Sequence, residues 1–248
     1  MTPKLGTLLQ QYSLTTIAEF LQEESFLSVR SYFGRTADNF DALYEHRRSW
    51  SYNFNRVFRK GLFQRIEKTK ETLEGMMSFT VLDVGCGSGR NSALFADLGA
   101  RRVVGIDLSA ALLELAREYA RAASVVDQCE FIQADILDYP FHETFDVVVA
   151  LGVFDYIADP VRALTRMTEL ANEKVVASFP GASLIRAPLR KLRYALRDGP
   201  VYFYTGTRLR QICHEAGLAK FRIDKLASSG YMLVGKKSAA KKRLVANA

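Results

Sequence analysis

The sequence has few of the residues that stabilise small secreted or metal-bound folds. Its three cysteines, Cys86, Cys129 and Cys213, lack the C-x-x-C spacing that is typical of disulfide frameworks and zinc sites. It therefore predicts no metal site and a reducing, cytoplasmic location. Polar residues interrupt the first 20 positions, and no apolar run is long enough to cross a bilayer. We accordingly expect neither a secretory signal nor a membrane span.

Acidic residues are missing from the C-terminal segment, residues 238–248, which is rich in lysine and arginine. Five basic residues at or just before this segment supply five of the seven excess positive charges of the chain: Lys236, Lys237, Lys241, Lys242 and Arg243. Such a run is more often a solvated tail than an arm that binds nucleic acid. Charge alone therefore gives no reason to expect a nucleic-acid partner.

A glycine-rich turn follows the first predicted buried strand. Residues 81–90 read V-L-D-V-G-C-G-S-G-R. Gly85, Gly87 and Gly89 let the backbone turn sharply and approach a ligand closely, and the helix that follows opens with free amide donors. The segment predicts a cradle for a nucleotide-like cofactor.

Three more apolar runs follow, at residues 103–106, 131–136 and 145–151. Asp107 ends the first of them, about 20 residues after the glycines, where a carboxylate can accept both hydroxyls of a ribose. Asp135 stands near the end of the second run, beside the expected adenine position. Repeated alternation of strands and helices predicts a parallel sheet with right-handed crossovers.

These motifs resemble the class I S-adenosylmethionine-dependent methyltransferases, over roughly residues 75–235. The matching segments are 83–89, 104–107, 134–136 and 145–151. The resemblance implies an α/β, Rossmann-like doubly wound sheet of seven strands with the last strand antiparallel. Dinucleotide dehydrogenases differ, because they typically show G-x-G-x-x-G after the strand.

The same resemblance implies S-adenosyl-L-methionine as the cofactor. Asp83, Gly85 and Gly87 are expected at its methionine end, Asp107 at the ribose, and Asp135 with Ile136 at the adenine. The full set that the resemblance places around the cofactor in the core is Asp83, Gly85, Cys86, Gly87, Asp107, Leu108, Asp135, Ile136 and Leu151.

Residues 1–75 are predicted to form a helical arm or cap in front of a core over residues 76–237. Long helical stretches are expected at 14–27 and 54–73. Segment 31–44 resembles the arm of many small-molecule methyltransferases, in which an aromatic residue closes over the cofactor, so Tyr32 and Tyr44 are candidates for that contact. Alternatively, these aromatic residues only pack the arm onto the core.

Helix signals recur within the core. Ser109 is predicted to cap a helix whose apolar face is formed by Leu112, Leu115, Ala116 and Tyr119. Asp159 and Pro160 are predicted to start a helix that reaches about Ala171, followed by a strand at 175–178. Segments 207–216, 219–225 and 231–236 resemble the last helix and the last two strands of the family.

The candidate catalytic residues Asp155 and Tyr156 follow the fourth strand, where ligands of such sheets bind. Related small-molecule methyltransferases often carry a Glu-His pair here, and the missing histidine argues against assistance by a metal. Either residue could accept a proton if its pKa were shifted, or Asp155 could instead orient the substrate or a loop amide. His46 is a third candidate base, with a non-catalytic surface position as its alternative. Methyl transfer can also proceed without a base, because positioning alone supplies much acceleration.

The insertion at residues 179–206 is predicted to form an amphipathic cationic lid. Ile185, Leu189, Leu192 and Leu196 share one helical stripe, with arginines around the rest. Such a lid would suit an anionic or lipid-like acceptor and could touch a membrane surface, whereas the alternative is a lid helix with solvated arginines. Residues 201–204 add an aromatic run that could wall an acceptor pocket. With the arm at Tyr32, this insertion resembles methyltransferases of the magnesium-protoporphyrin type.

The sequence thus predicts a monomeric or weakly dimeric S-adenosylmethionine-dependent methyltransferase that methylates an oxygen of a hydrophobic or anionic small molecule. Three alternatives stay open. They are methylation of nitrogen or carbon in a small metabolite, a regulatory protein that binds the cofactor without transferring a methyl group, and a nucleic-acid methyltransferase. Methyltransferases that act on base amino groups commonly carry Asn/Asp-Pro-Pro-Tyr/Phe after the fourth strand, where this chain has Leu151-Gly152-Val153-Phe154.

Overall fold

The computed structural model describes residues 52–181, 201–226 and 230–237. Seven strands form one sheet in the order β3-β2-β1-β4-β5-β7-β6. They are β1 (Phe79–Val84), β2 (Ala100–Asp107), β3 (Cys129–Gln133), β4 (Phe145–Ala150), β5 (Ala171–Phe179), β6 (Leu218–Lys225) and β7 (Tyr231–Lys237). The first five strands pair in parallel, and β7 is antiparallel to both of its neighbours. The predicted fold is confirmed.

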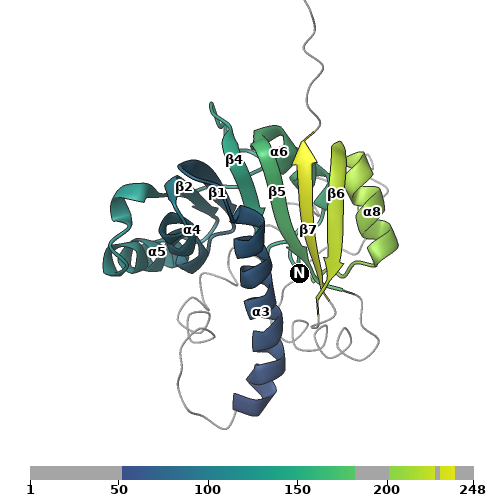
Figure 1. Ribbon diagram of the computed structural model, residues 1–248, viewed down its shortest axis with the longest axis horizontal. Coiled ribbons are helices and arrows are strands. Elements are labelled where there is room, and N and C mark those ends of the chain that lie inside the picture. The colour runs from purple at the N-terminus through teal and green to yellow at the C-terminus, as the bar shows by residue number, and fades with distance from the viewer. Residues whose placement is uncertain (1–51, 182–200, 227–229, 238–248) are drawn as a thin grey trace, which may run out of the picture.

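Helices cover both faces of this sheet (Figure 1). They are α3 (Tyr52–Leu73), α4 (Arg90–Asp97), α5 (Ala110–Ala122), α6 (Pro160–Leu170) and α8 (Gly206–Glu215), with a short 3-10 turn η1 (Val126–Gln128) before β3. In Figure 1, α3 crosses in front of the sheet, and α8 lies at the opposite end from α5. None of the helices in the described ranges is long and apolar enough to cross a membrane.

The central strands are buried on both faces, as expected for parallel strands between helical layers. All six residues of β1 are buried. Along β4, Val147 and Val149 belong to one apolar cluster, which also contains Leu73 of α3 and Phe95 of α4. Val148 and Ala150 belong to a second cluster with residues of α6 and α8, among them Leu164 and Leu209. Successive side chains along each strand therefore pack into two separate cores, one on each face of the sheet.

The predicted helix starts are confirmed. Ser109 caps α5 by accepting a hydrogen bond from the Leu112 amide, and Asp159 caps α6 through the Arg162 amide, with Pro160 in the first turn. The predicted apolar face of α5 was partly wrong. Leu112 and Ala116 are buried, but they share the core side with Leu113 and Ala120, whereas Leu115 and Tyr119 are only half-buried. The guanidinium of Arg90 lies 4.8 Å from the centre of the Tyr119 ring, at the boundary of this face.

Other sequence-based boundaries shift by a few residues. The predicted stretch 54–73 is helical as α3, while the stretch 14–27 lies outside the described residues. β3 ends at Gln133, so Asp135 lies in the turn after the strand rather than at its end. β5 continues to Phe179 and α8 begins at Gly206, so the two outermost residues of the predicted insertion belong to the core elements.

A reciprocal hydrogen-bond pair joins β1 and β4 near their amino ends. The amide and hydroxyl of Thr80 donate to Oδ2 of Asp146 at 2.8 and 3.0 Å, and the Asp146 amide donates to Oγ1 of Thr80 at 2.9 Å. Thr80 is buried, so water could not readily replace these partners. This pair fixes the register of the two central strands.

Replacing Asp146 with alanine should therefore lower the free energy of unfolding by ~2 kcal/mol, because the Thr80 amide and hydroxyl lose their acceptor. Urea unfolding of the purified variant measures the change. The matched control is Asp138→Ala, which removes only an exposed ion pair to Arg162 at 3.6 Å and should cost ~0.5 kcal/mol. Equal losses in the two variants would contradict the role of the Thr80–Asp146 pair.

Candidate cofactor site

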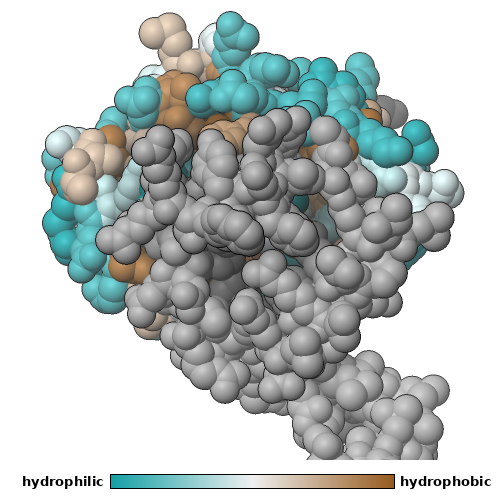
Figure 2. All heavy atoms as spheres, turned by 90° about the horizontal axis from the view of Figure 1, so that it is seen from below, coloured by the Kyte–Doolittle hydropathy of each residue, from teal (hydrophilic) through white to brown (hydrophobic). Residues whose placement is uncertain are grey.

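The carboxyl ends of the parallel strands meet at one edge of the sheet. Figure 1 shows β7 pointing upward, so the strands that run opposite to it end at the lower edge of that view. Figure 2 looks onto this edge, where the coloured rim is largely hydrophilic with apolar patches between. In doubly wound sheets ligands bind at this edge, next to the point where the strand order reverses. Here the reversal falls between β1 and β4.

The glycine turn after β1 connects three strands at this edge. The amides of Gly85 and Cys86 both donate to the Ile106 carbonyl of β2, at 2.7 and 3.2 Å. Gly85 has φ +63°, and a Cβ there would lie 2.5 Å from Cγ2 of Val153, in the loop after β4. Gly87 has φ +55°, and a Cβ there would meet no atom of the described residues within 4 Å. The turn is thus tightly packed at Gly85 and open at Gly87.

Asp107 links this turn to the end of β2. Its Oδ2 accepts from the Gly87 amide at 2.9 Å, and its Oδ1 accepts from the Ser109 amide at 2.9 Å. A carboxylate has about four acceptor positions, and the Leu108 amide is a third backbone partner of this one, so it keeps capacity for a ligand hydroxyl. Burial raises the pKa of Asp107, while its bonds to the backbone amides oppose that rise. The sequence predicted this carboxylate at the ribose, and the structure holds it beside the glycine turn.

Asp83 lies beneath the turn rather than at the surface. Its side chain is buried, and Ser92 of α4 donates to its Oδ2 at 2.6 Å. Burial raises the pKa of Asp83 to about 7, the Ser92 hydrogen bond opposes this, and the nearby Asp107 carboxylate raises the pKa further. Asp83 is therefore a partly protonated group at neutral pH, and a cation arriving above it would favour its charged form.

The side chain of Cys86 packs into the protein. A Cβ on Gly105 of β2 would lie 2.9 Å from the Cys86 sulfur, so only glycine leaves room for the thiol there. Burial raises the pKa of this thiol, which makes it unreactive at neutral pH. Any contact of Cys86 with a cofactor would have to use its backbone.

The other predicted adenine-side residues lie in the turn after β3. Oδ1 of Asp135 accepts from the Leu137 amide at 2.8 Å, and burial raises the pKa of the Asp135 carboxyl. The side chain of Ile136 is buried. The Ala134 amide donates to the Asp107 carbonyl at 3.2 Å, which ties this turn to the end of β2. Leu108 is half-buried, and its carbonyl accepts from the Gln133 side chain at 3.1 Å.

The loop after β4 carries Leu151 and the candidate catalytic pair. Leu151 is half-buried and packs on the α3-side core. Asp155 is buried, with 3% of its surface exposed, whereas Tyr156 is half-buried. A buried carboxyl suits orientation of the loop better than proton exchange with solvent, so Tyr156 is the more accessible of the two.

The predicted aromatic wall at residues 201–204 was wrong for Tyr204 and stays a prediction for the other residues. Tyr204 is buried in the core, where its hydroxyl donates to the Phe154 carbonyl at 3.2 Å and its ring packs edge-on against Phe179. It therefore cannot wall an open pocket. Tyr202 and Phe203 are half-buried and stay available for that role.

Sequence reasoning missed Arg65 of α3. Its Nη1 lies 3.3 Å from the position that a Cβ would take on Gly152, directly after Leu151. Its Nε is buried and has no hydrogen-bond partner among the described residues. A cation whose Nε lacks a partner among the described residues is suited to bind an anionic group at this edge. The sequence offered no signal for it, because Arg65 is one of several basic residues on a long helix.

The remaining candidates Tyr32, Tyr44 and His46 lie outside the described residues, as do residues 182–200 of the predicted lid. Within the described ranges, His, Cys, Asp and Glu side chains form no group of three or more that could hold a metal ion.

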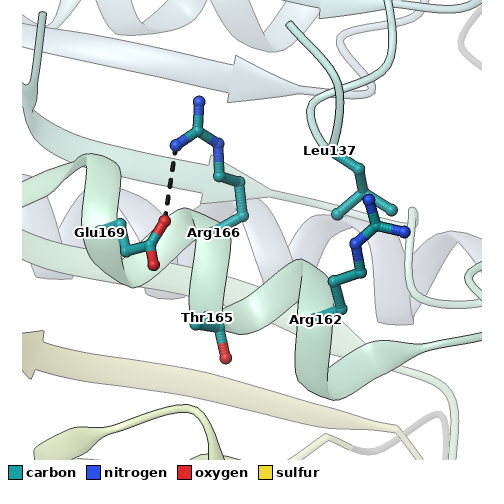
Figure 3. A pocket seen from close by; sticks show the side chains of 5 residues that line it. All are labelled: Leu137, Arg162, Thr165, Arg166 and Glu169. Atoms are coloured by element: carbon teal, nitrogen blue, oxygen red, sulfur yellow. Dashed lines mark hydrogen bonds and ion pairs between the residues drawn. The ribbon is translucent and has the colours of Figure 1, made fainter. Parts of the chain in front are cut away.

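A surface pocket occurs elsewhere, between α6 and the loop after β3 (Figure 3). It is lined by Leu137, Arg162, Thr165, Arg166 and Glu169. Its arginines already have acidic partners, since Arg166 pairs with Glu169 at 3.5 Å and Arg162 pairs with Asp138 at 3.6 Å. None of the predicted cofactor or catalytic residues lines this pocket.

Comparison with known proteins agrees with the fold that the glycine turn and the strand order indicate. Residues 81–194 match the family model described as a methyltransferase domain. Residues 81–194 are thus similar to a methyltransferase domain, which confirms the resemblance to class I methyltransferases. The matched segment includes the turn, Asp107 and the loop after β4.

Relatives and solved structures with this domain differ in what their names say they act on. The chain is 31% identical over 121 residues to a ubiquinone biosynthesis O-methyltransferase of Histophilus somni, covering 46% of this chain and 50% of that protein. It is 31% identical over 103 residues to a tRNA U34 carboxymethyltransferase of Shewanella baltica, covering 42% of this chain and 31% of that protein. The chain thus spans half or less of the length of these relatives.

The fold is also that of magnesium protoporphyrin IX methyltransferase from Synechocystis PCC 6803, solved with bound SAH. The TM-score is 0.71 at 22% identity, over 87% of this chain and all of that one. At this level of identity the likeness establishes the fold.

The raised pKa of Asp83 predicts a pH-dependent stability. In the folded protein the Asp83 carboxyl keeps its proton up to about pH 7, whereas in the unfolded chain it releases the proton near pH 3.8. The protonated carboxyl therefore favours folding at low pH, and this contribution is lost as the pH rises through 7. Asp83→Asn keeps an acceptor for Ser92 without titrating. Between pH 5 and pH 8 it should lose less stability than the wild type, by on the order of 2 kcal/mol in urea unfolding without cofactor.

The exposed Asp127→Asn serves as the control for this comparison and should keep the wild-type difference between the two pH values. If Asp83→Asn and the wild type lose the same stability over this range, the buried carboxyl is not the source of the pH dependence.

Proposed function

We propose that the protein transfers a methyl group from S-adenosylmethionine to an oxygen of a hydrophobic or anionic small molecule. The observation that carries the proposal is the Asp107 carboxylate, bonded to the Gly87 amide at 2.9 Å beside a turn that is open at Gly87. A ribose on this carboxylate places the rest of the cofactor along the glycine turn. The methyltransferase domain match over residues 81–194 supports the same chemistry.

Bound S-adenosylmethionine supplies an electrophilic methyl group on a positively charged sulfur. The protein has to hold the acceptor oxygen in line with that methyl group, exclude water and let the oxygen lose its proton. The loop after β4 is the element next to the turn, since Gly85 and Val153 are in contact. Tyr156 on this loop is the candidate group to receive the proton, and Asp155 is the candidate to orient the loop.

Arg65 is suited to hold the carboxylate of the cofactor's methionine. It reaches the carboxyl edge from α3, and its buried Nε lacks a partner among the described residues. Charge-assisted hydrogen bonds from a guanidinium to a carboxylate are among the stronger polar contacts in proteins. Asp83 under the turn carries the opposite charge when ionised and suits the cofactor's amino group.

The acceptor is inferred to be a small molecule contacted by Tyr156, Tyr202 and Phe203, which are half-buried near the loop after β4. We infer that the protein works as a monomer or weak dimer in the cytoplasm, which fits its three free cysteines. Peripheral membrane contact through the basic insertion remains part of this proposal. An RNA acceptor is the second candidate, favoured by the similarity to the tRNA U34 carboxymethyltransferase.

Replacing Asp107 with alanine should weaken binding of S-adenosylhomocysteine, the demethylated cofactor, by about 100-fold. The variant loses the ribose acceptor and the anchor of Gly87, each at a cost of about 1–3 kcal/mol. Isothermal calorimetry measures the affinity, with the exposed Asp127→Asn as the control. Unchanged affinity would remove Asp107 from the cofactor site.

Transfer of labelled methyl from S-adenosylmethionine into a cell extract tests the acceptor class. Label in the organic or small-molecule fraction is expected, and label in the RNA fraction would favour the second candidate. Absence of label together with absence of S-adenosylhomocysteine binding would contradict the proposal as a whole.

Replacing Arg65 with methionine keeps most of the side-chain length and removes the charge. S-adenosylmethionine should bind the variant about 10- to 100-fold more weakly, as expected for one lost charge-assisted contact. Decarboxylated S-adenosylmethionine, which lacks the carboxylate, should bind the variant and the wild type equally. If both ligands lost affinity to the same extent, Arg65 would not be the carboxylate contact.

A further inference from the structure

The loop after β4 is held by groups on two other segments of the chain. At its first residue, the Gly152 amide donates to Oγ of Ser178, near the end of β5, at 2.8 Å. Two residues later, the Tyr204 hydroxyl donates to the Phe154 carbonyl at 3.2 Å. Both contacts join a side-chain hydroxyl to the loop backbone, so they fix the path of the loop whatever its side chains are.

A third contact comes from the segment before α8. The Tyr202 amide donates to the Asp155 carbonyl at 2.9 Å. Tyr204 is itself anchored, because its amide donates to the Pro180 carbonyl at 2.9 Å and its ring packs on Phe179. The loop is therefore fastened to elements that pack into the core.

The two hydroxyls that hold the loop are both buried. Ser178 is 0% exposed and Tyr204 is 5% exposed, so neither exchanges its partner readily for water. Burial, assisted by the Asp155 charge, raises the pKa of Tyr204, which therefore stays a neutral hydrogen-bond donor. A buried neutral phenol is suited to hold a carbonyl and unsuited to accept a proton from a substrate.

The position of the loop matters for two reasons. It contacts the glycine turn, where the cofactor is proposed to bind, and it carries the residues that are proposed to face the acceptor. Gly152 has φ +83° and lies against Arg65, while Val153 packs against Gly85 of the glycine turn. Asp155 and Tyr156 follow directly. A shift of the loop would therefore change the distance between a bound methyl donor and the groups that face the acceptor.

We propose that Ser178 and Tyr204 are positioning residues for methyl transfer, which hold the loop of residues 152–156 in the geometry that the reaction requires. The inference rests on the proposed function. Neither residue touches the reacting atoms, so each acts through the loop backbone. Displacement of a reacting group by about 1 Å can reduce a rate by about 100-fold, so small shifts of this loop should be visible in turnover.

The test uses Ser178→Ala and Tyr204→Phe, each of which removes one hydroxyl. Thr168→Val is the matched control, because it also removes a buried hydroxyl hydrogen bond, to the Leu164 carbonyl within α6, without touching the loop. Labelled methyl transfer is measured over a dilution series of cell extract, which gives an apparent maximal rate and a half-saturating concentration. Affinity for S-adenosylhomocysteine is measured by calorimetry.

Both variants should lose about 10-fold or more in apparent maximal rate, with S-adenosylhomocysteine affinity within about threefold of the wild type. The control should keep the wild-type rate. Hydrogen exchange at the Gly152 amide should also be faster in Ser178→Ala than in the wild type and the control.

Wild-type rates in both variants, unchanged exchange at Gly152, or an equal loss of rate in the control would each overturn the inference. Cofactor binding by a wild-type protein that transfers no methyl group would also overturn it, while leaving the cofactor site in place. Absence of both binding and transfer would contradict the proposed function itself.

Discussion

The hydrogen bond from the Gly87 amide to the Asp107 carboxylate is the contact on which the candidate site depends. It joins the turn after β1 to the end of β2, and the second oxygen of the same carboxylate orders the start of α5 through Ser109. One half-buried side chain thereby sets the relative position of two strands and a helix. The turn can stay open at Gly87 because its other side is fixed by packing of Gly85 on Val153.

The rest of the fold keeps this edge in place. The central strands carry apolar side chains on both faces, so neither helical layer can slide without exposing a core. Polar groups concentrate instead at the carboxyl edge, where Asp83 and Asp107 lie close enough for the Asp107 charge to raise the pKa of Asp83. Two neighbouring carboxyls in partial isolation from water make the edge receptive to a cation. The Arg65 Nε, which has no partner in the part of the chain that the structure describes, makes it receptive to an anion.

The fold and the glycine turn could be predicted from the sequence, because both depend on local signals, whereas the cofactor contacts stay predictions. The glycine turn, the cap at Ser109 and the cap at Asp159 are each determined within a few residues. The role of Tyr204 could not be read in this way, since burial against Phe179 depends on how distant segments meet. Arg65 was missed for the same reason, as its proximity to Gly152 joins residues 87 positions apart. The buried face of α5 differs from the predicted face by about one position. A short helix with many apolar residues can present more than one apolar stripe, so the sequence does not decide which stripe is buried.

The most direct test of the central claim is a crystal structure of the protein with S-adenosylhomocysteine. We expect the ribose hydroxyls on the Asp107 carboxylate and the homocysteine end along residues 85–87, with its carboxylate near Arg65. Binding in the pocket beside α6, or a ribose without contact to Asp107, would contradict the proposed cofactor site.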